Sequence, residues 1–215
     1  MEKNGLLLVE GRDDLHVLSA LAEIYEITET FSIKETEGVD RLFDDLPIVL
    51  GTARYKELKY DIERLGIVID ANNEISKRWK SIYDILKAKG YPIKNKTDNN
   101  GLIIEDDSKD IPFVGLWIMP DNINNGMLED FFRNFIPEND KLLSKVNLCI
   151  DEVSNDKELP IPKPRSKAEI RTWLAWQKKS ESRMGYALSD KKNHLNIHNE
   201  NTEKFIDWVK RLFQS

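Results

Sequence analysis

Short runs of apolar residues alternate along the chain with segments whose apolar residues recur at helical spacing. Residues 6–9, 66–69 and 114–119 are largely apolar runs of the kind found in strands that are covered on both faces. Residues 31–33 and 102–104 predict two further strands, and helical spacing fills the intervals. Strands that alternate with helices favour a mostly parallel sheet with right-handed crossovers. The pattern therefore predicts an α/β protein with helices flanking the sheet.

A proline-rich segment divides this pattern near the end of the chain. Residues 160–164, PIPKP, predict an extended, stiff stretch that is either a boundary or a strap over the surface. We therefore predict an α/β core, residues 1–159, and a C-terminal helical extension, residues 160–215. The extension is too short for an independent core and is expected to pack on the first part. Ser166 and Glu169 have capping-box spacing for a helix within it.

The composition indicates a folded protein with an acidic charge balance. The chain has 215 residues, 40% of them hydrophobic, and a formal net charge of −6. This balance argues against coating nucleic acid through bulk positive charge, although a local basic groove or a bound metal ion can still meet phosphates. No run approaches the roughly 18 apolar residues of a membrane span, so we expect no membrane association and a cytoplasmic protein. The single cysteine, Cys149, has apolar neighbours and is predicted to be buried.

Acidic residues follow the three predicted buried strands. Glu10 follows the first, Asp70 the second, and Asp121 the third after one proline, so all three are expected at one edge of a parallel sheet. Asp14 lies four residues after Glu10 and can lean toward the same pocket. Crowded carboxylates raise one another's pKa unless a cation is present, and a hard ion such as Mg²⁺ or Mn²⁺ resolves that conflict. Each acid alone is better explained as a solvated cap or turn residue, but the three together favour a metal site.

The residues at these strand ends resemble the signatures of a known family. Residues 8–14, LVEGRDD, are similar to the first signature of Toprim domains, and residues 69–72, IDAN, to their Asp-x-Asp signature. Four further segments resemble a narrower group of small stand-alone Toprim-like proteins: LWIMPD (116–121), MLEDF (127–131), SKA (166–168) and LAWQ (174–177). The resemblance covers nearly the whole chain. It implies a Toprim-like α/β fold related to nucleases of the overcoming-lysogenization-defect type.

The resemblance also implies roles for particular residues. In the catalytic core shared by topoisomerases, primases and these nucleases, the glutamate matching Glu10 serves in acid/base chemistry or metal binding. The acids matching Asp14 and Asp70 hold Mg²⁺. Further metal ligands are expected among Asp121, Glu129 and Asp130. Lys167 matches the nuclease-type lysine that steadies a phosphate or the transition state, but a surface lysine in the first turn of a helix explains it equally well.

One position departs from the family pattern. The second aspartate of the Asp-x-Asp pair is Asn72 in this chain, a neutral and weaker metal ligand. The change should weaken Mg²⁺ binding or shift the metal toward Asp14 and Glu129, unless Glu74 compensates from the adjacent turn. It puts catalytic competence in doubt and leaves the fold untouched.

A basic stretch near the C-terminus has two interpretations. Its members are Arg165, Lys167, Arg171, Lys178, Lys179 and Arg183, interleaved with Trp173 and Trp176. It is either a phosphate-facing or base-stacking surface, or a docking helix whose tryptophans pack on the sheet while its charges face water. The second interpretation is preferred on sequence alone.

Two functions from different classes stay open. The first is a Mg²⁺-dependent phosphoryl-transfer enzyme that acts on nucleic acid, a nuclease in its simplest form. By resemblance, it is expected to work with an ATPase partner protein. The second is a binding module that keeps the fold, has lost efficient catalysis, and engages a partner protein or a nucleotide-like ligand.

Overall fold

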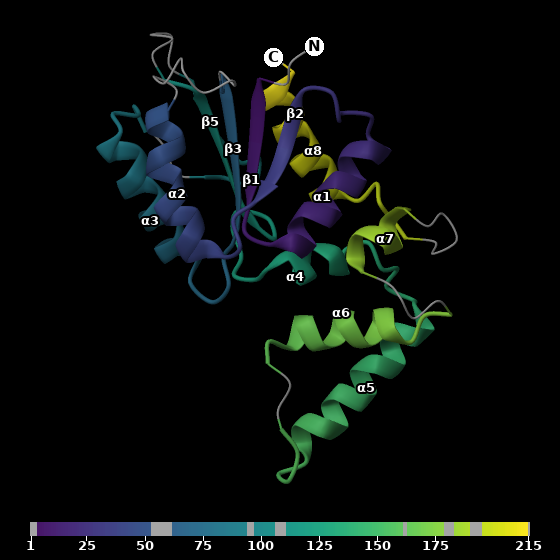
Figure 1. Cartoon of the computed structure of the whole chain (residues 1–215). Helices are drawn as coiled ribbons and strands as arrows, with labels where there is room; N and C mark the ends of the chain where they lie inside the picture. Colours follow the sequence, from purple (N-terminus) through teal and green to yellow (C-terminus); the bar gives the residue numbers. More distant parts are fainter. Residues whose placement is uncertain are drawn as a thin grey trace.

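The chain folds around one mixed β-sheet with helices on both faces, as a computed structural model shows (Figure 1). The structure describes residues 4–52, 62–93, 97–105, 111–160, 163–178, 183–189 and 195–214. Its strands are β1 (Gly5–Val9), β2 (Phe31–Glu35), β3 (Arg64–Asp70), β4 (Leu102–Ile104) and β5 (Phe113–Met119), in the spatial order β2-β1-β3-β5-β4. β1 pairs in parallel with β2 and β3, β3 pairs in parallel with β5, and β4 is antiparallel to β5. The predicted α/β fold with a mostly parallel sheet is confirmed.

Separate apolar layers cover the two faces of the sheet. The helices are α1 (Arg12–Ile24), α2 (Val39–Thr52), α3 (Ile75–Ala88), α4 (Leu128–Arg133), α5 (Lys141–Asn155), α6 (Arg165–Ala175), α7 (Met184–Ser189) and α8 (Glu200–Phe213). α2 and α3 cover one face, where Ile67 packs with Leu42, and α1 and α8 cover the other, where Val68 packs with Trp117 (Figure 1). Neighbouring residues of β3 are therefore buried on opposite faces, which explains its uninterrupted apolar run.

The last helix, α8, lies close against the strands at the centre of the sheet. A Cβ atom at Gly115 of β5 would lie 2.5 Å from Leu212 Cδ2 and 2.9 Å from Trp208 Cζ2, so only glycine permits this approach. The Trp208 indole N–H donates a hydrogen bond to the Leu102 carbonyl at 3.0 Å. The C-terminal helix is thus part of the main core, while the proposed boundary between residues 159 and 160 stays a prediction.

Helices α5 and α6 form a hairpin that extends from the body beyond α4 (Figure 1). Trp173 joins the hairpin to the body: it lies 6.4 Å from the Phe132 ring, and its indole N–H donates to Asp140 Oδ1 at 3.1 Å. In the part of the chain that the structure describes, no helix has the length and apolar character needed to cross a membrane.

Two local predictions in this hairpin are wrong. Cys149 is exposed, because its sequence neighbours point in other directions on α5 and the buried positions are Val146 and Ile150. α6 begins at Arg165 with Pro164 as its N-cap residue, so Ser166 already lies inside the helix and does not open a capping box. The proline occupies the place that the spacing had assigned to the serine.

Candidate functional site

The carboxyl ends of β1, β3 and β5 meet at the edge of the sheet that faces α4 and α6 (Figure 1). Glu10 directly follows β1, and Asp70 is the last residue of β3. The Asp70 backbone N–H donates to Glu10 Oε2 at 3.3 Å, so these two acids lie side by side on adjacent strands. Parallel pairing at this edge is what brings together residues 60 positions apart.

The tight turn after Glu10 directs Asp14 back toward the strand ends. Gly11 is the N-cap residue of α1, and its backbone N–H donates to Asp14 Oδ2 at 3.1 Å. The Asp14 side chain is therefore held over the helix start, and the residue is only 6% exposed. Its second oxygen, Oδ1, is buried and receives no hydrogen bond from the described residues. A buried carboxylate oxygen without a donor is costly unless another group satisfies it.

The start of α4 repeats this local structure and adds a fourth acid, Glu129, to the group. The Met127 backbone N–H donates to Asp130 Oδ2 at 2.8 Å, and the Ser166 hydroxyl is 3.3 Å from the same oxygen. Asp130 thus caps α4 and contacts α6. The Leu128 backbone N–H donates to Asp70 Oδ1 at 2.9 Å, which ties the helix start to β3. Glu129, the residue between Leu128 and Asp130, is 3% exposed, and its charge acts on Asp14.

Four carboxylates from separate segments interact strongly here: Glu10, Asp14, Asp70 and Glu129. Burial raises the pKa of Asp14 to about 7, and repulsion from Glu10 and Glu129 adds to the shift. Burial also raises the pKa of Asp70 well above its ordinary value, with further contributions from Asp14, Glu10 and Glu129. The pKa of Glu10 is raised by burial as well. We call these four residues the acidic site.

Two cations act on the acidic site from different helices. Lys167 of α6 lies with Nζ 3.5 Å from Glu129 Oε1. Arg78 of α3 and Lys167 both lower the pKa of Glu10, and the contribution of Arg78 is the larger. Arg78 was not predicted as a site residue, because no local pattern distinguishes it from Lys77 and Lys80 beside it.

Asn72 stands beside the acidic site in a special backbone conformation. Its φ of 53° lies in the left-handed region, which asparagine and aspartate enter more readily than other non-glycine residues. Its backbone N–H and carbonyl pair with Gly126 at 2.6 and 2.8 Å, which joins the loop after β3 to the loop before α4. Glu74, considered as a compensating ligand, is exposed and pairs instead with Lys77 at 3.1 Å.

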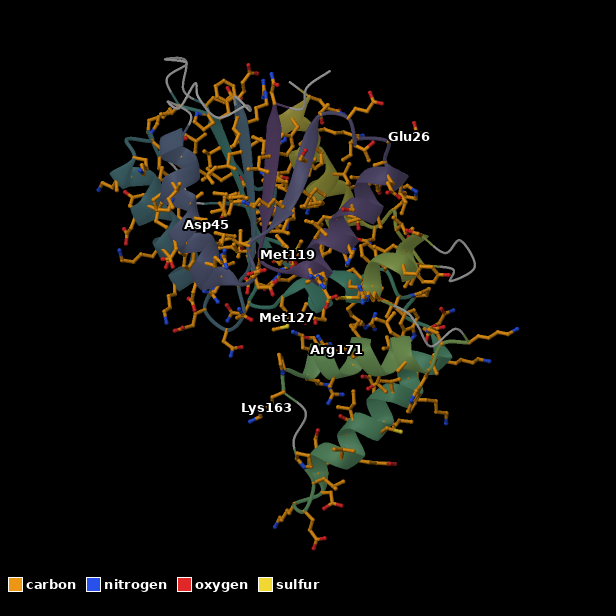
Figure 2. All side chains as sticks on the ribbon, in the orientation of Figure 1. Glu26, Asp45, Met119, Met127, Lys163 and Arg171 are labelled. Carbon is orange, nitrogen blue, oxygen red and sulfur yellow. The ribbon has the colours of Figure 1, made fainter. Side chains whose placement is uncertain are left out.

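Asp121 is engaged by its own loop. Its Oδ1 accepts the backbone N–H groups of Ile123 and Asn124 at 3.0 and 2.8 Å, and its Oδ2 accepts the Asn124 side-chain amide at 2.7 Å. The loop runs between Met119 and Met127, which Figure 2 labels at the edge of the sheet nearest α6. Asp121 is not among the residues that shift the pKa values of the acidic site, unlike Glu129.

The acidic site suits a hard divalent cation that keeps part of its water. Among the described residues, no group of three or more His, Cys, Asp or Glu side chains has the arrangement of a complete metal-binding cluster. Mg²⁺ is commonly held by one or two carboxylates, with waters and substrate oxygens as its other ligands. Asp14 offers a buried oxygen without a donor, and Asp70 and Glu10 supply further oxygens nearby. The donor set therefore fits Mg²⁺ or Mn²⁺ and not a softer metal that needs thiolates.

The fold and site define an α/β protein with buried acids at the carboxyl edge of a mostly parallel sheet. The chain belongs to the family described as protein of unknown function (DUF3226), whose model matches residues 4–214.

Comparison with solved structures found the C-terminal region of the OLD protein of Xanthomonas campestris pv. campestris. The structure phased with mercury is 12% identical, with a TM-score of 0.48, and the match covers 99% of this chain and 97% of that one. The structure phased with iodine is 14% identical, with a TM-score of 0.49, and covers 99% and 96%. No curated protein sequence matched the chain.

Proposed function

We propose that the chain is a Mg²⁺-dependent phosphoryl-transfer protein that acts on nucleic acid as a nuclease. The observation that carries the proposal is Asp14 Oδ1, buried without a donor among the described residues and surrounded by Glu10, Asp70 and Glu129. Such crowding costs free energy, because each carboxylate disfavours ionisation of the others. A divalent cation bound between the carboxylates offsets their mutual repulsion, so the same crowding favours cation binding. The Toprim resemblance of residues 8–14 and 69–72 supports the same assignment.

Each residue of the acidic site has a part in the proposed reaction. Asp14 and Asp70 would hold the metal ion. When bound, Mg²⁺ supplies charge stabilisation at a phosphoryl oxygen and a water of lowered pKa. Glu10 is suited to accept a proton, because burial moves its pKa toward the working range of a general base.

Lys167 would serve the substrate rather than the metal. Its side chain is 41% exposed, and its ammonium group already lies beside the buried Glu129 carboxylate. From this position it can contact a phosphate and stabilise the charge that develops during transfer. Glu129 would then hold the Lys167 ammonium group in place and add a fourth carboxylate to those around the metal ion.

A binding module without efficient catalysis is the second candidate, and Asn72 is the observation that favours it. A neutral amide replaces the charge expected at this position, while the left-handed backbone of Asn72 is compatible with either asparagine or aspartate. Such a protein would still bind a metal ion weakly, and it would engage a nucleotide or a partner protein without cleaving a phosphodiester.

A cleavage assay separates the two candidates. Plasmid, single-stranded DNA and RNA are incubated with the protein and Mg²⁺ or Mn²⁺, beside Glu10→Gln, Asp70→Asn and the control Asp84→Asn. Asp84 is an exposed residue of α3 that pairs with Lys80. The nuclease proposal expects cleavage by the wild type and the control, and losses of about 10²-fold or more in the other two variants. A wild type that binds metal and cleaves nothing supports the binding module.

A further inference from the structure

Arg78 is a half-buried cation that the acidic site alone does not explain. It lies in the first turns of α3, where its backbone N–H bonds to the Glu74 carbonyl. No described residue forms a hydrogen bond or ion pair with its guanidinium group. The neighbouring lysines of α3 differ, because Lys77 pairs with Glu74 at 3.1 Å and Lys80 with Asp84 at 2.7 Å. Of these three cations in the first turns of α3, Arg78 is thus the one that is left available to an outside anion.

Arg171 of α6 is a second arginine close to the acidic site, and it lies on a different helix from Arg78. It follows Lys167 by one helical turn, so both side chains lie on one face of that helix. Lys167 contacts Glu129 of α4, and Arg171 lies with Nη2 3.8 Å from Asp13 Oδ2 of α1. Figure 2 shows Arg171 on α6, below the loop end at Met127.

The ion pair of Arg171 is weak enough to be exchanged. At 3.8 Å, with side chains that are 62% and 45% exposed, it contributes little to stability. A phosphate accepts a bidentate pair of hydrogen bonds from a guanidinium group, which is a stronger interaction than this long contact. Arg171 can therefore leave Asp13 for a phosphate without a large cost to the fold.

We propose that Arg78 on α3 and Arg171 on α6 bind backbone phosphates of a polynucleotide strand on either side of the acidic site. The inference rests on the proposed function and deepens it, because it assigns the two side chains that hold the nucleic-acid backbone on either side of the reacting phosphate. In the proposed complex, the strand crosses the acidic residues on its way from one arginine to the other. Lys167 is then nearest to the reacting phosphate.

The charge of the chain makes such contacts necessary. With a net charge of −6 and four carboxylates at the site, a polyanion is repelled unless cations flank the point of reaction. Guanidinium groups on two separate helices oppose this repulsion at two positions along the strand. They position the backbone without reading its sequence, so the expected binding is independent of base identity.

Binding measurements at several salt concentrations test the inference. Fluorescein-labelled 20-nucleotide DNA and RNA strands are titrated with the full chain by anisotropy, once in EDTA and once with Ca²⁺. The variants are Arg78→Ala, Arg78→Lys and Arg171→Ala, and the controls are Lys77→Ala and Lys80→Ala. Each arginine-to-alanine variant is expected to weaken binding about five- to tenfold at low salt and to reduce the slope of log affinity against log salt by roughly 0.7. Arg78→Lys keeps the slope, and the controls keep both quantities.

The outcomes separate this inference from the proposed function. Unchanged slopes in both alanine variants overturn the inference, and so does a wild type that binds neither strand; metal binding and cleavage then still decide the proposed function. Conversely, a protein that binds no metal but shows the arginine effect in EDTA keeps the strand contacts and loses the nuclease assignment. A preference for the DNA or the RNA strand identifies the source of the phosphates.

Discussion

Lys167 and Glu129 form an ion pair of 3.5 Å between α6 and α4, although they are 38 residues apart. The glutamate is buried and belongs to the acidic site, whereas the lysine comes from the segment beyond residue 160. Ser166 adds a second link between the same two helices through Asp130. The C-terminal part of the chain therefore supplies cationic and polar groups to a site whose acids come from the sheet and from α1 and α4.

Removing the Lys167 side chain should lower the stability of the protein as well as its activity. Lys167→Ala leaves Glu129 buried without its cation, and we expect the free energy of unfolding in EDTA at pH 8 to fall by about 1 kcal/mol. Urea denaturation measures the change. The control is Lys204→Ala, which breaks the surface pair with Glu200 and should leave unfolding nearly unchanged. Equal, negligible effects of both variants would place Lys167 outside the site.

The stability of the metal-free protein should decrease as the pH rises toward 7. Asp14 has a pKa of about 7 in the folded state and an ordinary value of 3.8, so the native state holds its proton while the unfolded state releases it. Between these values stability falls by at most ~1.4 kcal/mol per pH unit, and the loss is complete above the folded pKa. Asp14→Asn should reduce this dependence, because only the raised pKa values of Asp70 and Glu10 remain, and it should raise the melting temperature at pH 8 in EDTA. Thermal melts from pH 5 to pH 8 test it, and an unchanged slope in the variant contradicts it.

Restoring an aspartate at position 72 should strengthen metal binding. Aspartate tolerates the left-handed backbone of Asn72, and the pairing with Gly126 involves only backbone atoms, so the loop should be preserved. One additional carboxylate at the edge of the acidic site should increase the affinity for Mg²⁺ about tenfold, which corresponds to ~1.4 kcal/mol. Isothermal titration calorimetry measures the change. No gain in affinity would place residue 72 outside the metal site.

The close approach of α8 to the sheet makes Gly115 sensitive to substitution. In Gly115→Val, the new side chain meets Leu212 and Trp208, so α8 must shift or the strand must bend. Overpacking of this kind typically costs about 1–3 kcal/mol, and we expect a clearly lower melting temperature. Gly51→Val is a matched control, since a Cβ atom at that position meets only Lys89 Nζ at 3.6 Å, an ordinary van der Waals contact. Equal melting temperatures of the two variants would contradict the packing of α8.

The pattern of apolar residues was sufficient to predict the fold. Runs such as residues 66–69 are buried on both faces, and this double burial is what a continuous apolar strand indicates. The adjacency of Glu10 and Asp70 also followed from parallel pairing, because strand ends meet at one edge regardless of their separation along the chain.

Other features depend on tertiary contacts that no local pattern records. The exposed face of α5 that carries Cys149, and the start of α6 at Arg165, are set by how the hairpin packs and by Pro164. Arg78 could not be distinguished from the lysines beside it, since its role depends on which charges lie opposite. Asp121 matched the strand-end pattern, yet its oxygens are taken by the loop that follows it.

The central claim is that Asp14 and Asp70 share a divalent cation, and crystals soaked in Mn²⁺ test it most directly. The account predicts an anomalous difference peak within coordination distance of an oxygen of Asp14 or Asp70, with the other residue bound directly or through one water. A peak that lies only at Asp121 or Asp130, or well-ordered carboxylates at full Mn²⁺ concentration without any peak, would contradict it.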